Sequence, residues 1–190
     1  MLVRLRALFA GLVGVAAIYG CDGPTTPTAQ FDNVNVKLIV YAMNGTPVLL
    51  PSAVAVRFGR TAYVDATFAF DLAFDIDDTG AVVVYTQQRV ASQLVATHRV
   101  GLQTSELGFA AADRAPTSGY AYDSLLTLPI GKTFFAEVLE QGCINTFLGP
   151  TVKAKFAVDS VNLTTRAIHL SALTNPNCGF KSLVPGEPKD

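Results

Sequence analysis

The sequence predicts an all-β protein, an antiparallel β-sandwich of immunoglobulin-like architecture. After residue 33, about eight or nine short segments alternate apolar with polar residues, which is the pattern of strands with one buried face. Turn residues separate these segments, and no long amphipathic helix interrupts them. Short, closely spaced strands of this kind are typical of sandwiches and barrels, so an up-and-down β-barrel is the alternative architecture.

The N-terminal segment is apolar but short. Arg4 and Arg6 precede a stretch that carries no further charged residue until Asp22. About 15 helical residues extend roughly 22 Å, whereas a spanning helix needs about 20 residues to cross a ~30 Å hydrocarbon core. The stretch is therefore too short for a stable membrane span and has the length of the apolar region of a secretory signal peptide.

The end of this stretch, Ile18-Tyr19-Gly20-Cys21, resembles the lipobox of bacterial lipoproteins: an aliphatic residue, a variable position, a small residue and the cysteine. The resemblance implies cleavage between Gly20 and Cys21, thioether lipidation of Cys21 and acylation of its new amino group. Several acyl chains on one residue would hold the protein stably on a membrane, because one chain alone binds reversibly. We therefore expect an exported protein, lipid-anchored in the bacterial cell envelope and facing the periplasm.

A proline- and threonine-rich segment, Gly23-Pro24-Thr25-Thr26-Pro27-Thr28, follows the cysteine. Such a composition favours an extended tether that separates a folded domain from the lipid headgroups. The predicted organisation has a cleaved signal helix, a lipidated tether, a single β domain and a C-terminal tail, at residues 1–20, 21–32, 33–184 and 185–190.

The first two predicted strands show the alternation most clearly. One runs from Val34 to Ala42 and ends at Asn44-Gly45, a dipeptide that tolerates the positive φ angles of a tight turn. The next covers residues 67–77, with large apolar side chains at the even positions and aspartates among the odd positions. Strict even spacing excludes a helix, and the predicted core face consists of Phe68, Phe70, Leu72, Phe74 and Ile76.

The middle of the chain has weaker turn signals. Asp77-Asp78-Thr79-Gly80 predicts a tight turn, after which strands are expected over residues 81–91 and 94–102. Since no strong turn signal separates them, one long bent strand with a bulge over 82–102 is the alternative. Residues 103–121 lack clear periodicity and predict a long surface loop that includes one helical turn.

The last third of the chain predicts a meander of three strands, at residues 132–140, 152–161 and 166–173. In an antiparallel meander the third strand returns to the edge at which the first one ends. Cys143 and Cys178 follow those two strands, so both sulfur atoms come to one end of the sheet. With Cys21 lipidated, this even pair in an exported protein predicts a disulfide, worth about 3.5–4 kcal/mol on the loop-entropy model.

Four aspartates between residues 71 and 78 form the most suggestive polar pattern. Asp75-x-Asp77-x-Thr79-Gly80 resembles the opening of a calcium-binding loop, in which oxygen ligands alternate ahead of a glycine turn. The resemblance makes Asp75, Asp77 and Thr79 candidate ligands, but Thr86 stands where such a loop needs a bidentate glutamate. A solvent-facing strand edge that leads into a polar turn is the other interpretation.

Other chemistry-bearing residues show no recognised spacing. His98 and His169 belong to no zinc-binding pattern. Glu137 and Asp159 are available as a carboxylate pair, but no tryptophan accompanies them as a sugar platform. No nucleophile elbow, phosphate-binding loop or dinucleotide fingerprint occurs, so we predict no catalytic residues, no metal site beyond the calcium candidates and no cofactor.

Two tyrosines, Tyr120 and Tyr122, follow Ser118-Gly119 in the predicted loop region. Exposed aromatic side chains in a loop can recognise a partner, which makes these two candidate binding residues. The alternative is that they close one end of the sandwich.

Composition and charge narrow the function. Apolar residues make up 50% of the chain, charged residues 15%, and the formal net charge is −1. A disordered chain would be richer in charge, and a nucleic-acid-binding protein would carry clustered lysines and arginines. We expect a non-enzymatic envelope lipoprotein, held by a lipid on Cys21, that binds an envelope protein or glycan through loops at one end. A lipocalin-like carrier of a small apolar ligand and a loop-based hydrolase are the alternatives.

Overall fold

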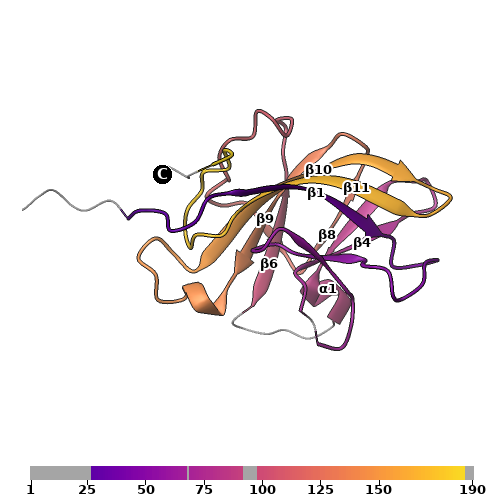
Figure 1. Cartoon of the computed structure of the whole chain (residues 1–190), viewed down its shortest axis with the longest axis horizontal. Coiled ribbons are helices and arrows are strands. Elements are labelled where there is room, and N and C mark those ends of the chain that lie inside the picture. The colour runs from indigo at the N-terminus through magenta and orange to yellow at the C-terminus, as the bar shows by residue number, and fades with distance from the viewer. Residues whose placement is uncertain (1–26, 68, 92–97, 187–190) are drawn as a thin grey trace, which may run out of the picture.

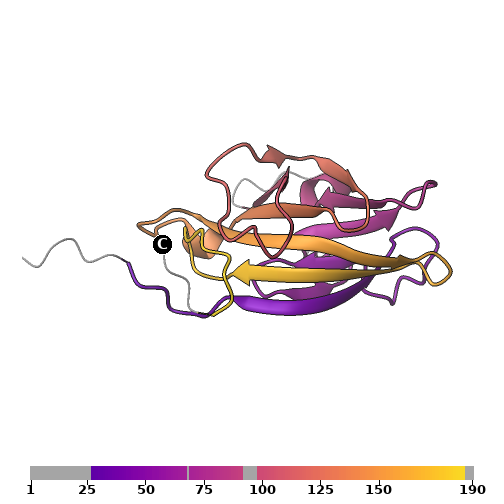
Figure 2. The same cartoon turned by 90° about the horizontal axis from the view of Figure 1, so that it is seen from above.

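The computed structural model describes residues 27–67, 69–91 and 98–186. Figure 1 shows two antiparallel sheets packed face to face, and Figure 2 shows the same two layers from above. The predicted β-sandwich is confirmed. Within the described ranges each sheet keeps its own two edge strands, so the barrel alternative is wrong.

The larger sheet consists of β1 (Val34–Tyr41), β6 (Arg99–Thr104), β7 (Ala121–Tyr122), β9 (Thr133–Leu139), β10 (Thr151–Asn162) and β11 (Ala167–Asn175). Its strands lie in the order β1-β11-β10-β9-β6-β7, and all neighbours are antiparallel. The predicted meander is therefore confirmed as β9, β10 and β11. The predicted first strand pairs with the last one, β11, and closes one side of the sheet.

The smaller sheet consists of β2 (Ala53–Ala55), β3 (Arg60–Ala62), β4 (Leu72–Ile76), β5 (Val82–Thr86) and β8 (Leu125–Leu128), in the order β3-β2-β4-β5-β8. A short helix, α1 (Gln87–Ala91), follows β5, and a 3-10 turn, η1 (Gln141–Cys143), follows β9. The continuous strand considered for residues 82–102 is wrong, because α1 ends β5 and the chain continues in the other sheet as β6.

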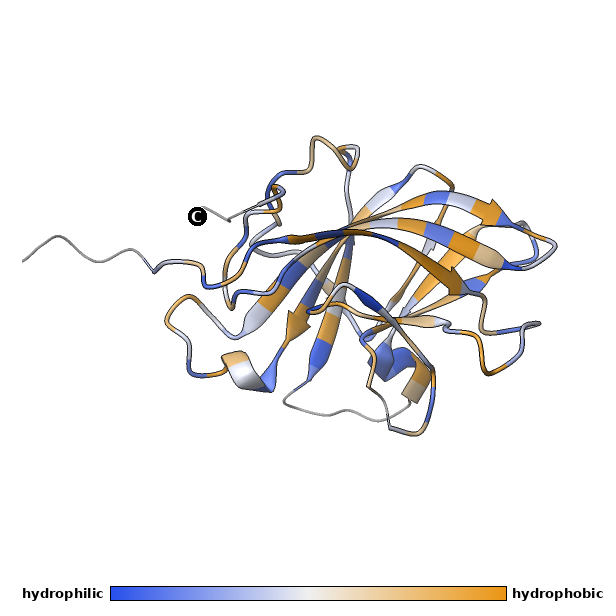
Figure 3. Cartoon of the chain, viewed as in Figure 1, coloured by the Kyte–Doolittle hydropathy of each residue, from blue (hydrophilic) through white to orange (hydrophobic). Residues whose placement is uncertain are grey.

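The inward faces of both sheets form one hydrophobic cluster, and Figure 3 shows the alternation that produces it along β10 and β11. The even-numbered side chains of β4 belong to this cluster, as predicted. Phe70 does not: it precedes β4 and packs with Ala53 and Ala73 in a second cluster on the other side of the smaller sheet. Phe68, the remaining member of the predicted face, lies outside the described residues.

Three odd-numbered side chains of this segment, Asp71, Ala73 and Asp75, are buried too, so the prediction that they lie on a solvent-facing strand edge is wrong. Asp71 and Asp75 are each only 5% exposed. The reason is that β4 is a central strand between β2 and β5. Its outer side is covered by further apolar side chains, among them Met43, Tyr85 and Val90.

The predicted loop of residues 103–121 is confirmed after β6 ends at Thr104. The loop includes one helical turn, in which the Ala112 N–H donates to the Gly108 carbonyl at 3.1 Å. The loop covers the outer face of the larger sheet, because Ala112 and Phe109 pack on Phe135 and its neighbours. A buried lysine, Lys155, supports the loop from below, since its Nζ donates to the Phe109 carbonyl at 2.9 Å.

The described chain begins and ends at the same end of the sandwich, which we call the tether end (Figure 2). Cys143 and Cys178 form the predicted disulfide there, with their Cα atoms 5.4 Å apart. The domain's contacts reach into the predicted tether and tail, since the Phe31 N–H donates to Asn177 Oδ1 at 3.0 Å and the Asn33 N–H to the Gly186 carbonyl at 2.9 Å.

The opposite end carries the β10–β11 turn, and we call it the hairpin end (Figure 1). The predicted signal peptide, its Gly20–Cys21 cleavage site and the lipidation of Cys21 lie outside the described residues. In residues 27–67, 69–91 and 98–186, no helix has the length and apolar character needed to cross a membrane.

Candidate functional site

A histidine and two carboxylates converge in a surface cavity beside the tether end. Asp71 immediately precedes β4, His98 immediately precedes β6, and Glu140 immediately follows β9. One donor atom from each of the three lies within 4.8 Å of the others. The cavity measures about 230 Å³, and the described residues that line it are Ala55, Arg57, Phe58, Arg60, Ala69, Phe70, Asp71, His98 and Glu140.

Strand pairing explains why these residues meet. Arg99 of β6 faces Leu139 of β9 in the antiparallel register, so the next residues outward, His98 and Glu140, emerge at the same edge. Helix α1 fixes the histidine from the other side, because Gln88 Nε2 donates to the His98 carbonyl at 2.8 Å.

The Asp71 carboxylate has a fixed orientation. Its Oδ2 accepts the Val56 N–H at 2.6 Å, and its Oδ1 lies 2.9 Å from His98 Nε2. The backbone of Asp71 is held as well, since its N–H donates to Val54 and its carbonyl accepts from Gln87. Buried hydrogen bonds of this kind leave the carboxylate little freedom to rotate.

Electrostatic coupling ties the three side chains together. The hydrogen bond to Asp71 raises the pKa of His98, aided by the charges of Asp71 and Glu140 and opposed by burial. Burial raises the pKa of Glu140, and the charge of Asp71 adds to this shift. Arg57 opposes it, because its Nη1 lies 3.8 Å from Glu140 Oε2. Asp71 and Glu140 thus provide two negative charges beside His98, and Arg57 and Arg60 of the same cavity offset them in total.

The arrangement suits cation binding or proton transfer better than nucleophilic catalysis. A Ser-His-Asp triad needs a hydroxyl within hydrogen-bond reach of the histidine. The described residues lining the cavity include no serine, threonine or cysteine. Among the described residues, Asp71, His98 and Glu140 are the group whose donor atoms are placed to hold a metal ion.

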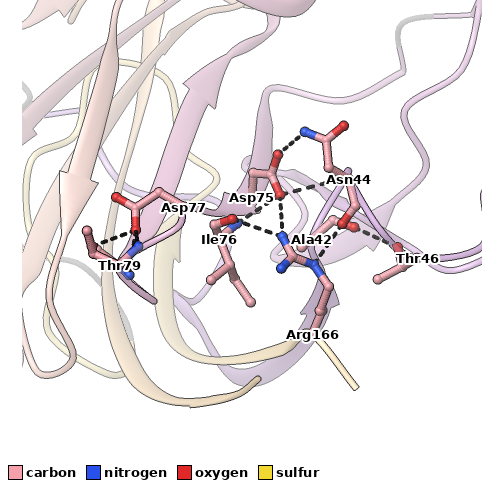
Figure 4. A network of polar contacts seen from close by, with 9 residues as sticks. Ala42, Asn44, Thr46, Asp75, Ile76, Asp77, Thr79 and Arg166 are labelled. Carbon is pink, nitrogen blue, oxygen red and sulfur yellow. Dashed lines mark hydrogen bonds and ion pairs between the residues drawn. The ribbon is translucent and has the colours of Figure 1, made fainter. Parts of the chain in front are cut away.

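The calcium candidates from the sequence lie at the hairpin end, in two separate hydrogen-bond networks (Figure 4). Asp75 Oδ1 pairs with Arg166 Nη2 at 3.2 Å, and the Asn44 side-chain amide donates to Asp75 Oδ2. Asp77 instead closes its own turn, where its Oδ1 accepts the Thr79 N–H at 2.9 Å and the Thr79 hydroxyl at 2.7 Å. The Thr79 hydrogen bond lowers the pKa of Asp77. Arg166 already supplies the positive charge beside Asp75.

The two candidate tyrosines lie on the outer face of the larger sheet, over a buried ion pair. Tyr122 donates its hydroxyl to Glu137, which also pairs with Lys153. The Lys153 ammonium lies 4.7 Å from the centroid of the Tyr120 ring. Burial raises the pKa of both tyrosines. These contacts give Tyr120 and Tyr122 a structural role on the sheet face and do not make them a plug at either end.

Asp159 and His169, which the sequence also offered as candidates, lie apart from the cavity of Asp71, His98 and Glu140 and have other contacts or positions. Asp159 accepts from Lys37 Nζ at 2.9 Å and from the Ser171 hydroxyl at 2.7 Å, so it does not join Glu137. His169 lies within β11, apart from His98. No local sequence pattern indicates the grouping of Asp71, His98 and Glu140, because only the pairing of β6 with β9 and the turn at α1 bring them together.

No protein-family model, curated protein or solved structure matches this chain. The interpretation of the cavity therefore rests on its own geometry. Each of the three side chains lies next to the end of a different strand, so each can be replaced separately in a test.

Proposed function

We propose that this chain is an exported lipoprotein of the bacterial cell envelope, a non-enzymatic binding module that a lipid on Cys21 holds at a membrane. The lipobox-like Ile18-Tyr19-Gly20-Cys21 is the observation that carries the proposal. The Cys143–Cys178 disulfide supports it, because disulfides persist in oxidising compartments outside the cytosol and are rare inside.

The position of the tether agrees with membrane attachment at one end. Pro27 and Thr28, the first described residues, line the same cavity as Phe147 and Leu148. Residues 22–26 separate Cys21 from Pro27, and a fully extended chain of this length spans about 20 Å at ~3.3–3.6 Å per residue. A lipid on Cys21 would therefore keep the tether end close to the headgroups.

The tether end also carries several exposed apolar side chains. Phe147 is 93% exposed, Phe31 and Phe58 are each 57% exposed, and Ile144 is 45% exposed. Phe31 and Phe58 line one cavity, and Phe31 and Phe147 line another, so these three phenylalanines form one neighbourhood. Contiguous exposed apolar surface marks interaction sites, and aromatic rings are favoured at the membrane–water interface. We place this end toward the bilayer and the hairpin end away from it.

A binding role at the surface accounts for the fold better than a carrier role. A lipocalin-like carrier needs an open interior, whereas the inward side chains of both sheets form one continuous cluster. A hydrolase of the serine or cysteine type built on the Asp71–His98 pair would need a hydroxyl or thiol nucleophile, and the described lining of the cavity provides none. A broad esterase and glycosidase screen tests that alternative directly.

Replacing the acylated cysteine tests the proposal. We expect the wild-type chain to incorporate labelled palmitate and to sediment with membranes, and Cys21→Ala to do neither. Cys143→Ser serves as a matched control, because it removes a cysteine without touching the lipid site and should leave labelling unchanged. If Cys21→Ala still takes up label and sediments with membranes, the anchoring proposal is wrong.

A further inference from the structure

We propose that Asp71, His98 and Glu140 form a binding site for a divalent transition-metal ion of the zinc type, with one coordination position left for water or a bound ligand. The three side chains lie next to the ends of three different strands, β4, β6 and β9, and converge on one cavity. This site does not depend on the lipid anchor.

The ligand set selects the class of metal. Zinc is bound by imidazole nitrogen and carboxylate oxygen, usually in tetrahedral geometry, and sites with three protein ligands keep the fourth position open. Calcium and magnesium prefer oxygen ligands alone, so an imidazole disfavours them. One histidine with two carboxylates therefore indicates a first-row transition ion.

The distances are close to those that a metal needs. Ligand atoms lie ~2.0–2.2 Å from zinc, which places two ligands of a tetrahedron about 3.3 Å from each other. Asp71 Oδ1 and His98 Nε2 are 2.9 Å apart, and all three donor atoms lie within 4.8 Å of one another. The side chains of His98 and Glu140 are 26% and 21% exposed, so each has room for the small rotation that completes the site.

Neighbouring groups orient the Asp71 carboxylate and leave Glu140 only weakly paired, so both are available to a metal ion. The Val56 N–H holds Asp71 Oδ2, which leaves Oδ1 facing the cavity, and hydrogen bonds of this kind orient metal ligands. Arg57 is the competing cation, but its 3.8 Å separation from Glu140 is longer than a charge-assisted hydrogen bond of about 2.7–2.9 Å. Arg60, the other arginine of the cavity, lies over the Phe58 ring at 4.9 Å.

A zinc titration of the full chain tests the site. The background is Cys21→Ser, because an unmodified thiol at this position would itself bind zinc. Competition against a chromophoric chelator should give one equivalent of tight binding. We expect His98→Ala and Glu140→Gln each to weaken it by about tenfold or more, since even the loss of a residue that only orients a ligand costs about 10–100-fold. His169→Ala is the matched control, since it removes the chain's other histidine, and its affinity should be unchanged.

Cobalt provides a second readout, because a tetrahedral Co²⁺ site gives intense visible absorption that His98→Ala should abolish. Circular dichroism and thermal melting check that each variant folds. If His98→Ala does not fold, Glu140→Gln still tests the inference. Absence of binding overturns the inference, and so does affinity that survives both His98→Ala and Glu140→Gln. Equal weakening by His169→Ala would assign the ion to an adventitious surface position and would also overturn it. None of these outcomes bears on lipidation at Cys21.

Discussion

Two buried aspartates belong to the β4 segment: Asp71 immediately precedes the strand toward the tether end, and Asp75 lies within it toward the hairpin end. Both are 5% exposed, and in the sequence both belong to one acidic pattern. Asp75 is neutralised by Arg166, which also donates to the Asn44 and Ile76 carbonyls and so closes its network (Figure 4). Asp71 faces a histidine and a second carboxylate across an open cavity.

This comparison shows that the partner, and not the aspartate, decides what the carboxylate can do. A buried carboxylate stabilises the fold when its partner is an arginine that is itself hydrogen-bonded to backbone carbonyls. The arginine already satisfies the charge of the carboxylate, so no cationic ligand is needed. A carboxylate that shares an open cavity with His98 and Glu140 keeps its Oδ1 beside the histidine and within reach of a ligand from solvent. We therefore expect the polar contacts of the hairpin end to stabilise the fold, and those of the tether end to bind a ligand.

Removing the arginine should produce the largest effect on stability. Arg166→Met leaves the Asp75 carboxylate buried without its cation, and breaking a buried pair in this way costs about 3–5 kcal/mol. Because the Arg166 side chain is 28% exposed, we expect a loss somewhat below that range, about 2–3 kcal/mol. Urea unfolding of the wild type and the variant measures the difference.

Lys37→Met is the matched control for this experiment. Its ammonium pairs with Asp159 at 2.9 Å, but the lysine side chain is 76% exposed. Exposed pairs contribute about 0–1 kcal/mol, so this variant should unfold almost with the wild type. Equal losses in Lys37→Met and Arg166→Met would show that the hairpin end has no special structural tie.

Removing the histidine should cost less stability than removing the arginine. His98→Ala takes one partner from Asp71, which keeps its hydrogen bond from Val56, and water can enter the cavity. An unsatisfied buried acceptor costs about 1–3 kcal/mol, and access to water brings the expected loss to about 1 kcal/mol. The measurement is urea unfolding with a chelator present, which excludes any contribution from bound metal. A loss as large as that of Arg166→Met would mean that the two ends do not differ in the way proposed.

The sequence predicted what depends on local periodicity. Alternation identified the sandwich and the meander of β9, β10 and β11, and the ends of these strands placed Cys143 beside Cys178. It failed at α1, because a five-residue helix is too short to show a helical period. Gln87 and Gln88 stabilise this helix through distant partners, the carbonyls of Phe70 and His98. The candidate metal site depends on that same turn of the chain.

The acidic pattern shows a second limit. In the sequence, alternation makes Asp71 and Asp75 equivalent and predicts that both face solvent. Whether that face is exposed depends on strand order, and β4 lies in the middle of its sheet under a second apolar cluster. Strand order follows from long-range pairing, which a pattern along one segment does not encode.

The smallest expected change in stability, and the sharpest contrast between the two ends, comes from tryptophan probes. The chain contains no tryptophan, so a single substitution provides the only indole emission. Phe147 at the tether end is 93% exposed, and Leu163 in the β10–β11 turn at the hairpin end is 63% exposed. Since neither side chain packs in the core, Phe147→Trp and Leu163→Trp should each change stability by less than about 0.5 kcal/mol.

In lipidated protein reconstituted into vesicles with brominated phospholipids, the two probes should differ. Because indole rings settle at the membrane–water interface, Phe147→Trp emission should shift to the blue and be quenched about twofold more than that of Leu163→Trp. The Cys21→Ala background supplies the control, since loss of the anchor should abolish quenching at both positions. Equal quenching of the two probes in anchored protein would show that the apolar side chains of the tether end do not contact the bilayer. This result would leave the proposal of a lipid anchor on Cys21 unaffected. The partner of those side chains would then be another component of the envelope, within about 20 Å of the lipid surface by the reach of the tether.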